Sequence, residues 1–231
     1  MTQQLVLVPG LLCTADLYAA QIDAFGARIH IAVPGIAEHD SIAATASAIL
    51  AAAAPRFALA GLSMGGYIAL EIMRQAPERV ERLALLDTSA RPDTPEQTEN
   101  RRRLVALAGK KGVGVPAREM FAKLGAPSRA SDADLLARFL AMAEATGTEG
   151  FARQQEAIAS RPDSRPTLAA IACPTLVLVG AEDQLTPPPL AEEIALGIRA
   201  SRLAIIPGAG HLSTLEEPAA GTAALATWLD L

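Results

Sequence analysis

One stretch of the 231-residue chain carries its strongest structural signal: Phe57-Ala58-Leu59-Ala60-Gly61-Leu62-Ser63-Met64-Gly65-Gly66. The apolar residues before Gly61 predict a buried strand, and a helical pattern begins after Ser63 and stops before Pro77. Glycines suit a sharp turn between the two elements, because side chains there would collide. Such a turn would hold Ser63 in a strained conformation with its hydroxyl exposed. An ordinary glycine-rich turn between a strand and a helix, without a catalytic role, is the alternative interpretation of this sequence.

The same alternation of apolar runs and helical stretches continues on both sides of this turn. The predicted strands cover residues 5–8, 29–33, 57–60, 83–86, 176–179 and 203–206. Their apolar runs are nearly continuous, which is typical of strands buried on both faces. Ser41 begins an alanine-rich helix that Pro55 ends, and Thr186 followed by Pro187 predicts a further helix capped by Thr186. We therefore expect an α/β fold with an open, mostly parallel sheet of six strands and helices on both faces.

Residues 90–168 break this rhythm, because they contain helix signals and no convincing strand. Thr94-Pro95-Glu96-Gln97 fits a capping box, and Ser131-Asp132-Ala133-Asp134 fits a second helix start. Gly147 can end that helix, and the segment 151–159 predicts another. We expect residues 90–168 to form a helical cap inserted after the fourth strand, with residues 1–89 and 169–231 forming the core.

Composition excludes several classes of protein. A net charge of −5 with scattered cationic residues argues against a nucleic-acid partner. Cys13 and Cys173 offer no disulfide framework, and the three histidines lack ligand spacing, so we expect no metal and no cofactor. Residues 1–8 lack the pattern of a signal peptide, and no apolar run approaches the roughly 20 residues of a membrane span. We expect a cytoplasmic protein without a membrane partner, acting as a monomer or homodimer.

A serine hydroxyl is a weak nucleophile unless a base activates it, and only three histidines are present. His30 lies within a predicted strand, and His39 lies in a loop where solvent contact is the common outcome. His211 follows the last predicted strand in a glycine-rich loop, Pro207-Gly208-Ala209-Gly210-His211, that could bring its imidazole over the sheet edge. His211 is therefore the candidate base, and a surface histidine is the alternative.

The candidate acid lies in the loop after the fifth predicted strand, where Glu182 and Asp183 are adjacent. A base needs such a carboxylate to fix its tautomer and stabilise the imidazolium. Asp183 is favoured, with Glu182 expected to cap or face solvent, and Asp87 after the fourth strand is the rival acid. Ser63, Asp183 and His211 would then all follow carboxyl ends of strands, where ligands bind in open α/β sheets.

A tetrahedral oxyanion needs two hydrogen-bond donors. The backbone N–H of Met64, next to the nucleophile, is one candidate. The other is the N–H of Leu11 in the loop after the first strand, Val8-Pro9-Gly10-Leu11-Leu12-Cys13. Cys13 itself is interpreted as a buried structural thiol, since no histidine is placed to activate it.

Taken together, these motifs resemble the α/β-hydrolase superfamily, in its small esterase, enol-lactonase and C–C hydrolase branch. The resemblance rests on Val8-Pro9-Gly10-Leu11, Gly61–Gly66, Pro174–Asp183 with Thr186-Pro187, and Gly208–His211, which span nearly the whole chain. It implies Ser63 as nucleophile, His211 as base, Asp183 as acid, and the N–H groups of Leu11 and Met64 as oxyanion hole. It also implies a cap that shapes the substrate pocket.

The sequence departs from this family in three places. Pro9-Gly10 replaces the usual His-Gly of the oxyanion loop, and residues 34–41 lack the usual aspartate after the second strand. The N-terminal strand pair of larger members is also missing. The expected sheet therefore has the order 2-1-3-4-5-6, with Leu11 and Ser63 meeting at the switch point between the first and third strands.

These observations predict a serine hydrolase that cleaves a small, mostly apolar carboxylic ester or lactone. A C–C bond hydrolase or lyase-type enzyme using the same residues is the first alternative, and a ligand-binding protein without turnover is the second. We expect a pocket with few charges. Met120, Phe121, Phe139, Met142 and Phe151 could line it, but core packing is the more common role at helical spacing. Arg101–Arg103 could attract a carboxylate, although a solvated helix face is the simpler interpretation.

Overall fold

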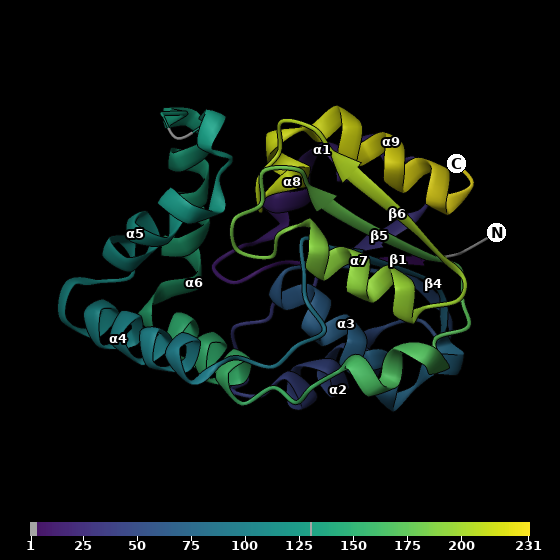
Figure 1. Cartoon of the computed structure of the whole chain (residues 1–231), viewed down its shortest axis with the longest axis horizontal. Coiled ribbons are helices and arrows are strands. Elements are labelled where there is room, and N and C mark those ends of the chain that lie inside the picture. The colour runs from purple at the N-terminus through teal and green to yellow at the C-terminus, as the bar shows by residue number, and fades with distance from the viewer. Residues whose placement is uncertain (1–3, 130) are drawn as a thin grey trace.

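A computed structural model describes residues 4–129 and 131–231 of the chain (Figure 1). Residues 1–3, which contribute to the expectation about a signal peptide, lie outside the described part. The six strands are β1 Gln4–Val8, β2 His30–Ala32, β3 Phe57–Leu62, β4 Val80–Leu86, β5 Thr175–Gly180 and β6 Ser201–Ile206. They pair in parallel in the order β2-β1-β3-β4-β5-β6, so the predicted sheet and its strand order are confirmed.

Helices cover both faces of this sheet. On one face α2 Ile42–Ala52, α3 Met64–Gln75 and α7 Pro188–Gly197 pack on alternate strand residues such as Val6, Leu59 and Val177. On the other face α1 Ala19–Phe25 and α9 Pro218–Leu229 pack on the intervening residues, among them Leu5 and Ala60. The short helix α8 Ser213–Glu216 precedes α9. Alternate residues of the central strands thus face two separate apolar layers.

The two edge strands depart from the expectation of burial on both faces. In β6, Leu203 and Ile205 are 38% and 44% exposed, and β2 has no fully buried residue. β2 and β6 are the outermost strands of the sheet, so each has a neighbouring strand on one side only. Apolar residues in these strands therefore reflect strand propensity as well as burial.

Within the described residues, three α-helices are inserted between β4 and β5: α4 Pro95–Lys111, α5 Gly114–Leu124 and α6 Ala133–Ala159. The capping box at Thr94 and Gln97 is present, and Asp132 caps α6. Gly147, at φ 73°, interrupts α6 as the sequence predicts. We call α4, α5 and α6 the inserted helices; Figure 1 shows them beside the carboxyl ends of the strands, contacting one another.

None of the described helices is both long and apolar enough to cross a membrane.

Candidate active site

The turn after β3 has the strained geometry that its sequence predicts. Ser63 has φ 55° and ψ −114°, a backbone conformation that residues other than glycine rarely adopt. Gly61 and Gly65 permit it, since a Cβ atom at Gly61 would lie 2.1 Å from the carbonyl oxygen of Gly65. A Cβ atom at Gly65 would lie 2.1 Å from the carbonyl oxygen of Val8. The turn after β3 therefore packs directly against the end of β1.

Three of the predicted residues form one line of hydrogen bonds. The Ser63 hydroxyl lies 2.8 Å from Nε2 of His211, and Nδ1 of His211 lies 2.8 Å from Oδ2 of Asp183. All three side chains are almost fully buried, so the expectation that the turn exposes the Ser63 hydroxyl to solvent is wrong; Ser63 instead lines a cavity. With the proton on Nδ1, the imidazole donates to Asp183 and accepts from Ser63, which is the tautomer that base catalysis needs.

The candidate acid, Asp183, is held by more groups than the sequence indicates. Oδ1 of Asp183 accepts the backbone N–H groups of Leu185 and Thr186, at 2.8 Å and 2.9 Å. The Thr186 hydroxyl donates to Oδ2 at 2.7 Å and lies 3.1 Å from Nδ1 of His211. The prediction of Thr186 as a helix cap is wrong, because α7 begins at Pro188 with Pro187 at the cap position. The spacing Asp-x-x-Thr is the sequence signal for these contacts, because an aspartate can accept hydrogen bonds from the backbone N–H groups two and three residues ahead.

The negative charge of Asp183 and a positive charge on His211 stabilise each other. Burial works against an ionised Asp183, but His211 and Thr186 outweigh it and lower the pKa of this carboxyl. Burial likewise works against a protonated His211, but the nearby carboxylate of Asp183 raises the pKa of the imidazole. The pair thus favours a positive charge on His211 balanced by Asp183, as proton transfer from Ser63 requires.

The rival acid Asp87 makes other contacts. Its Oδ1 accepts the N–H of Gly180 at 2.8 Å, and its Oδ2 bonds the hydroxyl of Ser213. Burial, with the charge of Asp183 nearby, raises the pKa of Asp87 to about 8. No hydrogen bond joins Asp87 to His211 within the described residues. Asp87 therefore ties β5 to α8 beneath the site.

The other candidates are placed as follows. Leu11 lines the cavity beside Ser63, and Met64 is the first residue of α3, whose N–H has no partner within that helix. Glu182 accepts a hydrogen bond from the hydroxyl of Ser128, which lies between α5 and α6. Cys13 is buried, which raises the pKa of its thiol to about 12 and makes it a poor nucleophile.

His30 and His39 lie away from the cavity. Within the described ranges, no three His, Cys, Asp or Glu side chains are grouped to hold a metal ion.

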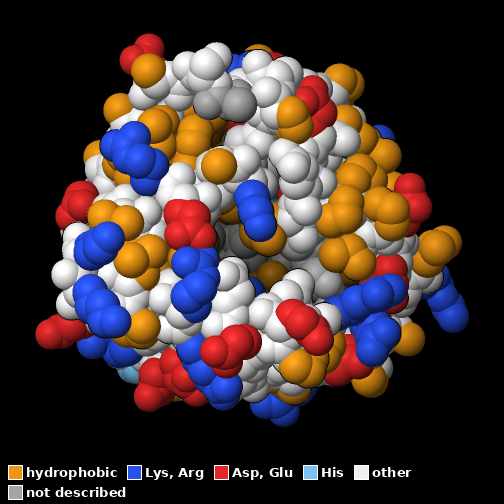
Figure 2. Space-filling view, turned by 60° about the vertical axis from the view of Figure 1, so that its left-hand side comes forward, with side chains coloured by type: hydrophobic (Ala, Val, Ile, Leu, Met, Phe, Trp, Pro, Cys, Tyr) orange, Lys and Arg blue, Asp and Glu red, His pale blue; other side chains and the backbone are white. Residues whose placement is uncertain are grey.

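A cavity of about 320 Å³ opens above Ser63 and His211, between the sheet and the inserted helices. Figure 2 shows a hollow on this side of the molecule, with basic and acidic side chains around it. Met120 lines the cavity, whereas Phe121, Phe139, Met142 and Phe151 pack into the core.

The expectation of few charges in the pocket is wrong. Arg91, Asp93, Arg101, Lys123 and Arg161 all line the cavity. The solvated face expected for Arg101–Arg103 holds for Arg102, which is 74% exposed, but Arg101 is only 19% exposed. The run of three arginines sits on a helix, so its members point in different directions.

The chain matches the model of the alpha/beta hydrolase family over residues 5–225. The provisionally named non-heme bromoperoxidase BpoC of Mycobacterium tuberculosis is 35% identical over 173 residues, which are 71% of this chain and 64% of that protein. The 3-oxoadipate enol-lactonase 2 of Acinetobacter baylyi is 29% identical over 167 residues, 72% of this chain and 61% of that protein. The chain thus spans less than two thirds of the length of these relatives.

Among solved structures, a thermophilic esterase from Thermogutta terrifontis superimposes with a TM-score of 0.89 at 33% identity, covering 99% of this chain and 89% of that chain. The family match agrees with the six-stranded parallel sheet described above. The chain belongs to the alpha/beta hydrolase family.

Proposed function

We propose that this protein hydrolyses a small, mostly apolar carboxylic ester or lactone through an acyl-enzyme on Ser63. The observation that carries the proposal is the line of hydrogen bonds from the Ser63 hydroxyl through His211 to Asp183. The volume of the cavity suits a small molecule, and leucine side chains make up much of its wall. The esterase and the enol-lactonase among the similar proteins act on substrates of this class by name.

The proposed reaction has two steps. Oγ of Ser63 attacks the substrate carbonyl while its proton moves to Nε2 of His211, and the N–H groups of Leu11 and Met64 hold the oxyanion. The intermediate expels the alcohol oxygen, which takes the proton from His211, and leaves an acyl group on Ser63. Water then attacks this ester, again with His211 as base, and releases the acid. Asp183 keeps its charge throughout and orients the imidazole.

The inserted helices are proposed to act as a cap, because cavity residues such as Leu104 and Met120 come from them. C–C bond cleavage by the same residues stays the alternative, and would show as Ser63-dependent turnover of a diketone with weak ester activity. Ligand binding without turnover would show as tight binding alone. The cytoplasmic location and the action as a monomer or homodimer stay predictions.

The experiment that tests the proposal compares the intact protein with Ser63→Ala and His211→Ala on a short p-nitrophenyl ester. Both variants should fold and lose hydrolysis by a factor of about 10⁴ or more, since the groups act as a unit. Ser128→Ala, which alters an exposed serine outside the cavity, is the matched control and should keep full activity. Hydrolysis that persists in Ser63→Ala would contradict the assignment.

A further inference from the structure

The cavity carries a surplus of positive charge although the chain as a whole is negative. Arg91 is balanced by Glu193, with two contacts of 2.9 Å. Arg101 and Arg161 both pair with Asp93, which is the single acidic side chain among the described residues that line the cavity. Lys123 adds a further positive charge to this lining. Such a surplus next to apolar walls attracts an anion, because solvent screens it poorly there.

Polar donors on one side of the cavity are left without partners. Arg101 gives N–H bonds to both oxygens of Asp93 and to Oε1 of Gln155 at 2.8 Å, which leaves two of its five N–H groups free among the described residues. Gln155 is 1% exposed and lines the cavity, yet its Nε2 amide has no hydrogen-bond partner. A buried donor without a partner is costly, and an acceptor on a bound ligand would remove that cost.

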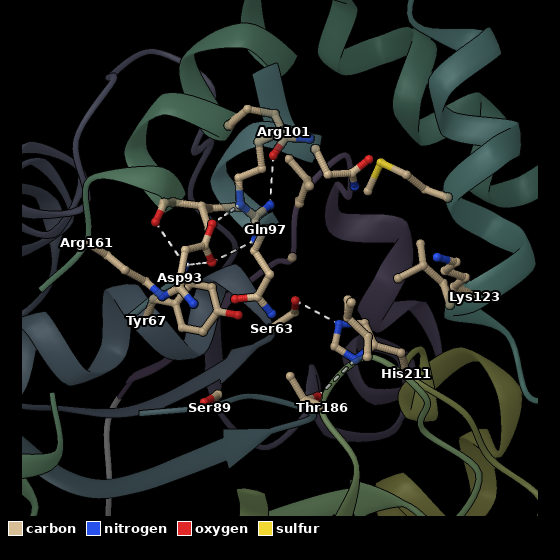
Figure 3. Close-up of a pocket in the computed structure, with 18 of the residues that line it drawn as sticks. Ser63, Tyr67, Ser89, Asp93, Gln97, Arg101, Lys123, Arg161, Thr186 and His211 are labelled. Carbon is tan, nitrogen blue, oxygen red and sulfur yellow. Dashed lines mark hydrogen bonds and ion pairs between the residues drawn. The ribbon is translucent and has the colours of Figure 1, made fainter. Parts of the chain in front are cut away.

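We infer that the substrate carries a carboxylate at its non-reacting end, which binds the free N–H groups of Arg101 and the Nε2 amide of Gln155. The inference rests on the hydrolase function proposed above and narrows its substrate to esters or lactones of a dicarboxylic acid or a related acid. Figure 3 shows Arg101, Asp93 and Arg161 on one side of Ser63 and His211 on the other. The apolar side chains of Leu62, Leu104 and Ile158 line the same cavity and suit the chain between the two ends of the substrate. Lys123, exposed at the cavity, adds long-range attraction.

A purely structural role explains only part of the cluster that Asp93, Arg101 and Arg161 form. The Asp93 side chain, 1% exposed, joins the loop after β4 to Arg101 of α4 and to Arg161, which follows α6, so it anchors the inserted helices. One arginine would be enough to neutralise the Asp93 carboxylate, so the second arginine leaves one positive charge unbalanced. The Arg161 guanidinium also stacks on the ring of Tyr67, at 4.1 Å from the ring centroid, and Tyr67 lies one helical turn after Ser63. The surplus charge and the unpartnered amide therefore point toward a ligand.

The test compares p-nitrophenyl hydrogen glutarate, which carries a carboxylate, with uncharged p-nitrophenyl hexanoate of similar length. We expect the intact protein to prefer the charged ester in kcat/KM. Arg101→Gln should lower the ratio of charged to neutral kcat/KM by about tenfold or more, because a charge-assisted pair is lost. Gln155→Glu should lower it too, since it keeps the acceptor for Arg101 but replaces the amide donor with a repelling oxygen. Arg102→Gln, a neighbouring exposed arginine, is the matched control and should leave the ratio unchanged.

A binding measurement separates this inference from the function itself. In the Ser63→Ala background, monomethyl glutarate should bind more tightly than methyl hexanoate by calorimetry, and Arg101→Gln should remove the difference. If Arg101-dependent binding is found but Ser63→Ala still hydrolyses esters, the proposed function fails and the carboxylate site stands. If hydrolysis needs Ser63 but the intact protein shows no preference for the charged ester, the carboxylate site fails alone. Equal effects of Arg101→Gln and Arg102→Gln would also overturn it. If Arg101→Gln does not fold, Gln155→Glu gives the decisive comparison.

Discussion

At the scale of single residues, Thr186 connects the proposed acid, Asp183, to the proposed base, His211. Its hydroxyl and its backbone N–H both donate to Asp183, and its oxygen lies close to Nδ1 of His211. Thr186→Val keeps the shape and the backbone contact but removes the hydroxyl donor. We expect kcat for a p-nitrophenyl ester to fall about tenfold, because a hydrogen bond to a charged group is lost.

Thr186→Ser is the matched control, since it retains the hydroxyl and should recover most of the rate. The pH profile of kcat/KM separates orientation from folding. Loss of the hydroxyl should move the acidic limb, which reports protonation of His211, while thermal unfolding stays nearly unchanged. An unchanged rate and limb in Thr186→Val would refute this role.

At the scale of elements, the contact between the serine turn and β1 depends on Gly65. Its position leaves no room for a Cβ atom, because the backbone oxygen of Val8 would lie 2.1 Å away. Gly65→Ala should therefore lower the free energy of unfolding by several kcal/mol and abolish hydrolysis.

Gly109→Ala provides the contrast, since Gly109 lies in α4 with open space where the Cβ would be. That change should raise the free energy of unfolding by about 0.5–1 kcal/mol, as alanine favours a helix. Urea unfolding measures both variants. Equal stability of the two would refute the close approach between the turn and β1.

A second element-scale contact joins the His211 loop to the segment that follows α5 through Glu216. This carboxylate, 2% exposed, accepts the N–H groups of Ala126, Gly210 and Leu212 at 2.8, 3.0 and 2.9 Å. Glu216→Ala would leave three buried donors unpaired. We expect a loss of about 3 kcal/mol or more in the free energy of unfolding, together with a lower kcat.

Glu192→Ala, at an exposed position of α7, is the control for Glu216→Ala and should change both quantities little. Denaturant unfolding and ester kinetics on the same preparations give the comparison. A similar small effect of the two substitutions would show that Glu216 does not hold this loop.

At the scale of the whole molecule, Asp87 makes stability depend on pH. Its pKa is raised to about 8, so the folded protein keeps a proton that the unfolded chain, with an aspartate pKa of about 4, releases. A raised folded-state pKa stabilises the protein below the unfolded value, and the stabilisation is lost as pH rises from about 4 to about 8.

Asp87→Asn resembles the protonated carboxyl and cannot titrate. Its free energy of unfolding should therefore decline less steeply with rising pH than that of the intact protein. The charge of Asp87 also helps to raise the pKa of His211, so Asp87→Asn should weaken that contribution as well, and both changes make the decline less steep. Equal slopes in urea unfolding across this pH range would contradict the role of Asp87.

The sequence predicted the order of the strands, but it predicted the contacts of the site only in part. Continuous apolar runs predicted all six strands, and family resemblance predicted their order, because both depend on local pattern and chain connectivity. The expected burial of β6 on both faces was wrong, because the predicted order places this strand at an edge, where an apolar run reflects strand propensity as well as burial. The contacts of Arg101 with Gln155 and of Glu216 with Ala126 join residues 54 and 90 positions apart, so no local pattern predicts them.

Trapping the acyl-enzyme tests the central claim most directly. The protein is mixed with a p-nitrophenyl ester, quenched in acid within the burst phase and analysed by mass spectrometry after digestion. We predict one added acyl group, located on Ser63, in the intact protein and none in Ser63→Ala. An acyl group on another residue, or turnover by the alanine variant at the rate of the intact protein, would contradict the account.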